Sequence, residues 1–320
     1  MIRLLLFLAI ALPLGWVQAQ DKFPSKPLRI IVPVPPGGNL DAVARAVGER
    51  MSLGLGQPVI VENRPGASST VGTRFVGQSP ADGYTLLAIG NTFLSTPIVM
   101  ANSGYDPVKD FLGVSMVCRV ANIVVVPASS PFQSIGDLIA HAKAKPGDVS
   151  YGTAGPGSVG HIAGERFSHF VGVRFLHIPY KGNAPAQVDL LGGRVGMMFD
   201  QVSTSAAHVK AGRLRGLGVA SLQRSSILPD VPTLDEAGVK GFEDYTVNAL
   251  MAPAGTPREV MTRLHAEVVK ALNSPELRTR FQGQGVEPYP SASYEEFSQY
   301  VRDEVARYGK LAREANIKAE

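Results

Sequence analysis

Cysteine is nearly absent from this sequence, because Cys118 is the only one among 320 residues. An internal disulfide is therefore excluded, and the fold must be stabilised by packing alone. The near neighbours of Cys118 are apolar, with Val117 on one side and Val120 close on the other. We therefore expect a buried, unreactive thiol at this position rather than a nucleophile.

Strong charge of one sign is also missing. Charged residues make up only 18% of the chain, the formal net charge is +4, and no run of five Lys or Arg occurs. Such a composition excludes the basic footprint of a nucleic-acid-binding protein, so we expect no nucleic-acid partner. A mildly basic surface can nevertheless help to gather anionic solutes.

Long apolar runs are confined to the N-terminus. Arg3 provides a positive start, residues 4–14 form a short apolar run, and Val17-Gln18-Ala19 offers the small or aliphatic residues that a signal peptidase reads. We predict a secretory signal peptide over residues 1–19, cut after Ala19. The run is too short to span a bilayer comfortably, and no later stretch reaches about 18 apolar residues. The expected product is a soluble periplasmic protein.

The motifs of common catalytic sites are missing as well. The sequence contains no HExxH, CxxC, GxSxG or GxxxxGK[ST]. Gly155-x-Gly157-x-x-Gly160 matches the dinucleotide fingerprint in form, but no acidic residue ends the next strand near Tyr180, and Pro156 occupies the tight turn. We therefore expect neither a dinucleotide nor another cofactor.

One pair of side chains keeps an enzymatic alternative open. Ser158 and His161 are three residues apart and can face one another as nucleophile and base in a cleft hydrolase. The sequence nominates no third group to orient the base, however. His161 and Glu165 are too few to make a metal site. The leading expectation is a protein that binds and does not catalyse, and that holds no metal.

Alternation of apolar runs and amphipathic helices is the main positive signal. Unbroken β-rich runs between helices are typical of parallel sheets that are covered on both faces. The expected strands are 28–34, 58–62, 84–89, 148–153, 174–178, 195–199 and 214–220. The expected helices are 41–51, a helix ending near 78, 158–170, 184–191, 259–272, 274–282 and 294–314.

Two further apolar segments predict where the chain passes between lobes. Residues 114–126 are interrupted by Arg119 and Asn122 and resemble two strands with a crossing between them, and residues 246–251 form a second crossing strand. The crossings place residues 22–120 and 250–320 in one lobe and 121–249 in the other. Two α/β parallel-sheet lobes joined by a two-strand hinge make a type II-like periplasmic binding protein fold, with a ligand cleft between the lobes.

Three turns between a strand and a helix are rich in glycine and small polar residues. They are 35–41, 63–70 and 153–158. Ligands bind at the carboxyl ends of parallel strands, and the amides at a helix N-terminus favour an anion. We expect Asn39 to act as an N-cap, Ser158 to offer its hydroxyl and amide to a carboxylate, and His161 to support the loop. Asp200 ends a strand and either caps the next helix near Ser203 or binds a ligand amine or hydroxyl.

Several motifs together resemble one known family along nearly the whole chain. They are VPVPPGGNLDAVAR (32–45), VENRPGASSTVGT (61–73), SPADGYTLL (79–87), YGTAGPGSVGHIAGERF (151–167), IPYKGNAPA (178–186), RSSILPDVPTLDEAG (224–238) and APAGTP (252–257). The sequence resembles the Bug-type receptors, which are the substrate-binding components of tripartite tricarboxylate transporters. Departures are Val34, where an aromatic residue is common, and Ser68-Ser69 in place of a glycine pair.

The resemblance implies a two-domain fold that binds a small carboxylate or amino-acid-like ligand, and membrane permease subunits as partners. The ligand-binding residues that it implies are Pro36, Gly37, Gly38, Asn39, Asp41, Ser68, Ser69, Thr70, Thr153, Gly157, Ser158, His161 and Asp200. We expect a monomer. A periplasmic sensor or scavenger that signals its occupancy remains the alternative to a transport receptor.

Overall fold

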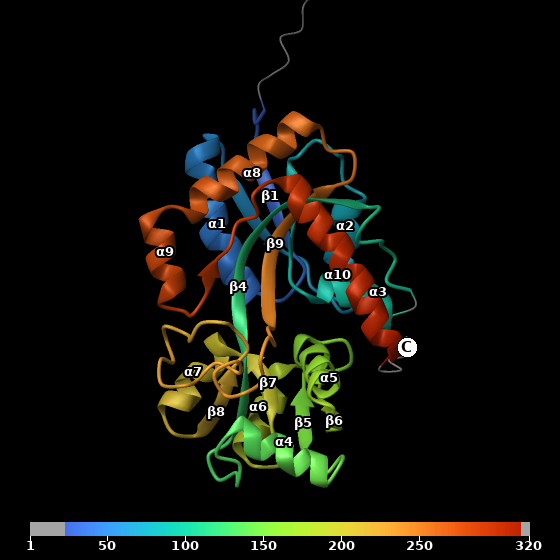
Figure 1. Ribbon diagram of the computed structural model, residues 1–320. Coiled ribbons are helices and arrows are strands. Elements are labelled where there is room, and N and C mark those ends of the chain that lie inside the picture. Colours follow the sequence, from blue (N-terminus) through green and yellow to red (C-terminus); the bar gives the residue numbers. More distant parts are fainter. Residues whose placement is uncertain (1–22, 101, 315–320) are drawn as a thin grey trace, which may run out of the picture.

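The computed structural model describes residues 23–100 and 102–314. The predicted signal peptide and its cleavage site lie outside these residues. Figure 1 shows two lobes, one above the other, joined by the long strand β4 (Phe111–Pro127) and by β9 (Tyr245–Pro253). The two-lobed α/β prediction is confirmed. The residue ranges assigned to each lobe from the sequence remain our proposed division.

The upper lobe is built on a mixed sheet with the strand order β10-β4-β9-β3-β1-β2. Strand β1 (Leu28–Val32) pairs in parallel with both β2 (Val59–Asn63) and β3 (Thr85–Ile89). Strand β9 runs antiparallel to β3 and to β4, and the short β10 (Glu287–Pro288) closes the edge beside β4. The carboxyl ends of β1, β2 and β3 therefore meet at one edge of the sheet.

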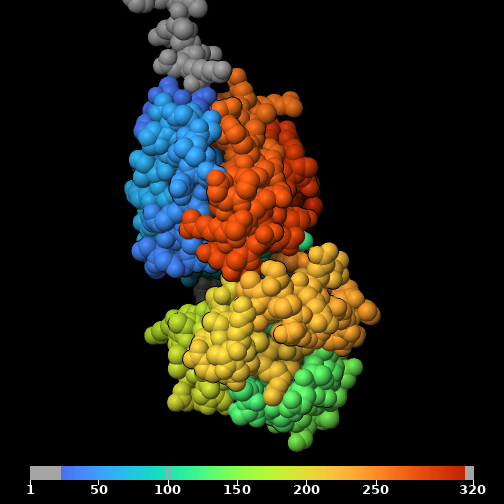
Figure 2. Space-filling model, turned by 90° about the vertical axis from the view of Figure 1, so that its left-hand side faces the viewer, coloured from blue at the N-terminus to red at the C-terminus, as the bar shows by residue number. Residues whose placement is uncertain are grey.

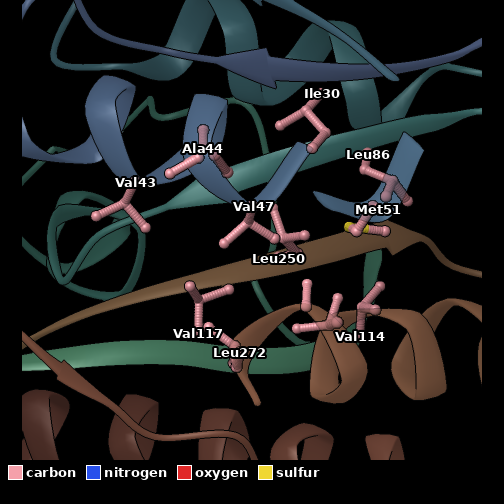
Figure 3. Packing of buried hydrophobic residues seen from close by; sticks show 14 of the residues in the cluster. Ile30, Val43, Ala44, Val47, Met51, Leu86, Val114, Val117, Leu250 and Leu272 are labelled. Carbon is pink, nitrogen blue, oxygen red and sulfur yellow. The ribbon is translucent and has the colours of Figure 1, made fainter. Parts of the chain in front are cut away.

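Helices cover both faces of this sheet, because its strands are apolar on both sides. Ile30 packs beneath α1 (Asn39–Leu55) and α8 (Arg258–Leu272), and Figure 3 shows this cluster with Val47 and Leu272. Helix α9 (Pro275–Gln282) extends the same layer. The next residue, Ile31, points to the opposite face. That face is covered by α2 (Thr70–Gly77), α3 (Thr92–Val99) and α10 (Tyr294–Glu314).

The lower lobe uses the far end of β4 as its central strand. There β4 pairs antiparallel with β7 (Met198–Gln201) and β8 (Leu214–Val219). Strands β5 (Ser150–Thr153) and β6 (Leu176–Pro179) form a parallel pair, which a bridge between Tyr151 and Met197 connects to β7. Four helices surround these strands: α4 (Ile135–Ala144), α5 (Val159–Val171), α6 (Asn183–Leu191) and α7 (Val202–Lys210).

The expectation of two separate strands within residues 114–126 is wrong, because β4 is one strand of 17 residues. The polar residues are accommodated without a break. Arg119 pairs with Glu287 of the edge strand, and buried Asn122 hydrogen-bonds to Asp244 and accepts a hydrogen bond from the Thr246 hydroxyl. Helices α3 and α4 were not predicted, and α7 was expected only as the helix near Ser203 that follows Asp200, without bounds. Pro97 inside α3 and the Ser and Thr residues of α7 weaken their helical signal.

Cys118 is fully buried, as expected, and burial raises the pKa of its thiol to about 12. Within residues 23–100 and 102–314, no helix combines the length and the apolar character that crossing a bilayer requires.

Close packing of α5 on Tyr151 generates a first prediction. A Cβ atom at Gly164 would lie 2.5 Å from the fully buried Tyr151 ring, so we expect Gly164→Ala to destabilise the protein by about 1–3 kcal/mol. Gly309→Ala on α10 is the matched control, since its Cβ would meet only the flexible end of Arg313 at 3.6 Å. Alanine is the better helix former, so this control should keep or raise stability. Urea unfolding measures both, and equal effects would contradict the packing argument.

Candidate functional site

The first glycine turn lies exposed at the carboxyl end of β1. Pro36, Gly37 and Gly38 are exposed, and a Cβ atom on either glycine would meet nothing within 4 Å. Gly37 has a φ of 93°, which favours glycine. The expectation that Asn39 caps α1 is wrong, because Gly38 is the N-cap. Asn39 is the first helical residue, and its side-chain oxygen accepts a hydrogen bond from Asn248 of β9.

Asp41 holds this turn in shape. Its carboxylate accepts hydrogen bonds from the Gly37 N–H at 3.0 Å, from Arg45 Nε at 3.1 Å and from Asn63 Nδ2 at 2.9 Å. Burial opposes ionisation, but the hydrogen bonds from Arg45, Gly37 and Asn63 outweigh it and lower the pKa of Asp41 to about 2. The carboxylate therefore organises the loop, and through Asn63 it links the first turn to the end of β2.

The second turn carries backbone strain. Ala67, Ser68 and Ser69 all have positive φ values, of 43°, 51° and 73°. Such left-handed conformations cost free energy in residues other than glycine and often occur at ligand-binding sites. Ser68 is exposed, whereas Thr70 at the start of α2 is buried. The strained turn presents the two serines at the same sheet edge as the first turn.

The turn of the lower lobe is fixed by two stacked histidines. The Gly157 N–H donates to Nδ1 of His161 at 3.0 Å, so Nδ1 is the acceptor and Nε2 carries the hydrogen. The His161 ring stacks on His177 with centroids 4.1 Å apart, and Nε2 of His177 lies 2.7 Å from the Thr153 hydroxyl. Burial lowers the pKa of both histidines to about 4, so both rings are neutral near pH 7.

Ser158 is the most unusual residue of this turn. It occupies the N-cap of α5, but its hydroxyl forms no capping bond and is buried without a partner among the described residues. Buried polar groups are normally hydrogen-bonded, so an unpaired hydroxyl requires an explanation. The first N–H groups of α5, from Val159 to His161, likewise have no acceptor in the described part of the chain. Together these donors can receive an anionic oxygen.

The same geometry does not support the hydrolase alternative. A nucleophile and its base must be hydrogen-bonded or within reach of one another. In the described residues the Ser158 hydroxyl has no hydrogen-bond partner, and Nδ1 of His161 is engaged by the Gly157 N–H.

Asp200 lies at the end of β7 and connects the two helices that follow β6 and β7. Its carboxylate accepts hydrogen bonds from Asn183 at 3.0 Å, from Gln187 at 3.2 Å and from the Ser205 hydroxyl at 2.6 Å. The expectation that Asp200 caps the helix near Ser203 is wrong, because the N-cap of α7 is Gln201 and Asp200 accepts from a side chain within the helix instead. In this arrangement Asp200 ties α6 and α7 to the end of β7.

The two lobes meet beside these turns. The Ser95 hydroxyl on α3 donates to the Gly157 carbonyl at 2.8 Å, and Ile162 of α5 packs with Phe93 and Leu94 of the upper lobe. Figure 2 shows a recess between the blue N-terminal part of the upper lobe and the yellow-green part of the lower lobe. Among the described residues, no hydrogen bond joins turns 36–39 or 68–70 directly to turn 153–158.

Several organising residues were missed by the sequence analysis: Asn63, Ser95, His177 and Asn248. Asn63 sits at the carboxyl end of a predicted strand, which is a signal that could have identified it. The other three are distant from the turns in sequence, and only the tertiary fold brings them into contact.

A family model described as tripartite tricarboxylate transporter family receptor matches residues 43–317. The chain belongs to this family. The receptor is 35% identical to the protein BugT of Bordetella pertussis, over 99% of both chains.

Solved structures also resemble the receptor over most of its length. A Rhodopseudomonas palustris protein with adipate has a TM-score of 0.81 and 35% identity, covering 93% of the receptor and 100% of that chain. MatC from Rhodopseudomonas palustris, with bound malate, has a TM-score of 0.76 and 28% identity, covering 90% and 99%. The predicted family is confirmed, and the receptor is a solute-binding protein with the periplasmic binding protein fold.

The stacked histidines predict a pH dependence of stability. Their folded pKa values of about 4 lie below the ordinary value of 6.5, so the unfolded chain binds more protons between these values. The free energy of unfolding should therefore fall as the pH drops from 6.5 to 4. His161→Gln should show a shallower fall in urea titrations across this range. His169→Gln, on the exposed side of α5, is the control and should keep the original slope. Identical slopes in all three proteins would contradict the assignment.

Proposed function

We propose that the receptor captures a small organic carboxylate between its lobes in the periplasm and delivers it to a permease of the tripartite tricarboxylate type. It reaches that compartment through the signal peptide 1–19, acts as a monomer, and releases its ligand chemically unchanged. Two similar structures contain dicarboxylates, adipate and malate. The single observation that carries the proposal is the unpaired, buried Ser158 hydroxyl at the start of α5.

The start of α5 has the chemistry that a carboxylate requires. A carboxylate has only acceptor oxygens, and the unpaired groups at this helix end are donors: one hydroxyl and the N–H groups of residues 159–161. Hydrogen bonds to a charged acceptor are about twice as strong as neutral ones. The partial positive charge of the helix end adds to the attraction. No positively charged side chain is needed for this recognition.

The upper lobe supplies the opposite wall. Gly37 and Gly38 leave open space in which a ligand can approach the backbone, and Asn39, Ser68 and Ser69 add polar groups. We assign Asp41, Thr70, Thr153, His161 and Asp200 to supporting roles, because their polar groups hold the turns or are buried beneath them. The remaining predicted residues, Pro36 and Gly157, shape the two turns.

Closure follows from the position of the donors. The Ser158 hydroxyl is shielded from solvent, so a ligand must enter while the lobes stand further apart. The lobes, residues 22–120 with 250–320 and residues 121–249, then close around it. A ligand drives closure only by binding the closed state more tightly, and the α5 donors provide that difference.

A thermal-shift screen tests the ligand class. Mono-, di- and tricarboxylates, amino acids, aromatic acids, neutral sugars and metal ions are added separately to the mature protein. A ligand at about a hundred times its dissociation constant adds about 2.7 kcal/mol, so we expect a clear rise in Tm with at least one carboxylate. Stabilisation by sugars or metal ions alone would refute the carboxylate proposal.

Two serine N-caps of the lower lobe allow a matched comparison. Ser158→Ala should weaken carboxylate binding about tenfold or more and leave stability unchanged, because its hydroxyl bonds to nothing in the described part of the chain. Ser134 caps α4 with a complete capping box, so Ser134→Ala should cost about 1 kcal/mol of stability and leave affinity unchanged. Calorimetric titration and urea unfolding measure the two effects. Unchanged affinity in Ser158→Ala would remove the α5 end from the site.

A further inference from the structure

A cavity of about 680 Å³ lies against the two hinge strands, β4 and β9. We call it the hinge cavity. It is lined by β4 and β9 where they cross between lobes, by α10 and the segment before it, and by Arg166 of α5. None of the turns 36–39, 68–70 and 153–158 contributes to its walls. Its volume falls within the range of about 300–1,000 Å³ that is typical of small-molecule sites.

The cavity has three arginines, and each already holds a carboxylate. Arg119 forms a two-point pair with Glu287, with Nε–Oε2 and Nη2–Oε1 distances of 2.8 and 2.9 Å. Arg307 contacts both carboxylate oxygens of Glu304 in the same way. Each of these guanidinium groups therefore already pairs its charge with a carboxylate through two N–H donors, so an additional anion would gain less from it.

The charge of Arg166 is paired as well. It pairs with the buried carboxylate of Asp244 and also donates to the backbone carbonyl of Glu243 at 3.1 Å. Removing it from Asp244 to bind an anion would leave a buried charge uncompensated, which is strongly unfavourable.

Two carboxylates in the lining are left without a cationic partner among the described residues. In that part of the chain the Glu243 carboxylate accepts a hydrogen bond from the Tyr245 hydroxyl at 3.1 Å, and Glu296 accepts one from the backbone N–H of Ala292, which precedes α10. The lining holds three arginines against four acidic residues, Glu243, Asp244, Glu296 and Glu304. The pairing of Arg119 with Glu287 outside the lining makes the excess of negative charge larger. The cavity is therefore suited to a cation.

Aromatic rings make up much of the remaining wall: Tyr245, Tyr289, Phe297, Tyr300 and Tyr308. Cations already lie on these rings. The guanidinium carbon of Arg119 is 4.3 Å from the ring centre of Tyr245 and 4.1 Å from that of Tyr289. Tyr300 stacks on Phe297 and carries no such cation among the described residues. Aromatic faces together with carboxylates are the elements with which proteins bind organic ammonium ions.

The ionisation of Tyr245 agrees with this charge balance. Burial is the largest cause that raises the pKa of its phenol to about 12, and the Glu243 and Glu287 carboxylates contribute in the same direction against Arg119.

We propose that the hinge cavity is a second ligand site, which binds a small organic ammonium ion through Glu243 and the tyrosine faces. Its walls come from both lobes: Glu243 and Arg166 belong to the lower lobe, and Tyr300 and Arg307 lie on α10 of the upper lobe. An occupant therefore bridges the lobes at the hinge. Figure 1 shows α10 descending from the upper lobe towards the lower one.

Calorimetric titration of the mature protein with choline tests the proposal, with the neutral isostere 3,3-dimethyl-1-butanol as the comparison ligand. We expect choline to bind and the alcohol to bind at least about fivefold more weakly. Glu243→Gln should weaken choline binding about fivefold, whereas Glu49→Gln, an exposed acidic residue on α1, should change nothing.

A second variant separates this site from the interlobe cleft. Gly38→Leu fills the open space at the first turn, since Gly38 has an ordinary φ of −80° and no neighbour within 4 Å of a Cβ. It should abolish carboxylate binding and leave choline binding intact. Choline binding that equals that of the alcohol, that ignores Glu243→Gln, or that disappears with Gly38→Leu would overturn the second site.

Discussion

The hydrogen bond from the Gly157 N–H to Nδ1 of His161 is the interaction on which the proposed site depends. It folds the β5–α5 turn back on its own helix and fixes the tautomer of His161. The ring of His177 then supports His161 from one side and is held by Thr153. With these polar groups engaged, the Ser158 hydroxyl and the first α5 amides of the turn stay unpaired within the described residues. The groups that hold the turn in shape are thus hydrogen-bonded to one another, whereas the donors that a carboxylate can use stay available.

The second constraint is on the movement of the lobes. Strands β4 and β9 connect the two lobes, so these strands must bend or twist whenever the angle between the lobes changes. Their crossing is unusually polar for a buried region, with Asn122, Asp244 and Thr246 bonded to one another and to Arg166. Arg166 lies on α5, whose N-cap residue is Ser158. The hinge and the proposed carboxylate site therefore share one helix, which gives the two proposed sites a physical route for coupling.

Much of the fold could be predicted from the sequence, because apolar strands such as 28–32 and 85–89 and amphipathic helices such as 294–314 carry strong periodic signals. The turns at 36–39, 68–70 and 153–158 could be predicted because glycine and small polar residues follow strands. The course of β4 could not, since Arg119 and Asn122 look like interruptions until Glu287 and Asp244, distant in sequence, supply their partners.

The roles of individual site residues were harder to predict for the same reason. Whether Asp41 and Asp200 face a ligand or the protein depends on Asn63, Asn183 and Ser205, whose proximity only the fold creates. The hinge cavity corresponds to no sequence motif, because the residues that line it are spread from 91 to 308 in the sequence.

The central claim is that a ligand carboxylate lies at the start of α5. A crystal structure of the receptor with a bound dicarboxylate tests it most directly. The account predicts a carboxylate oxygen within hydrogen-bonding distance of the Ser158 hydroxyl and of at least one N–H among residues 159–161. A carboxylate bound elsewhere, with the Ser158 hydroxyl still unpaired, would contradict it.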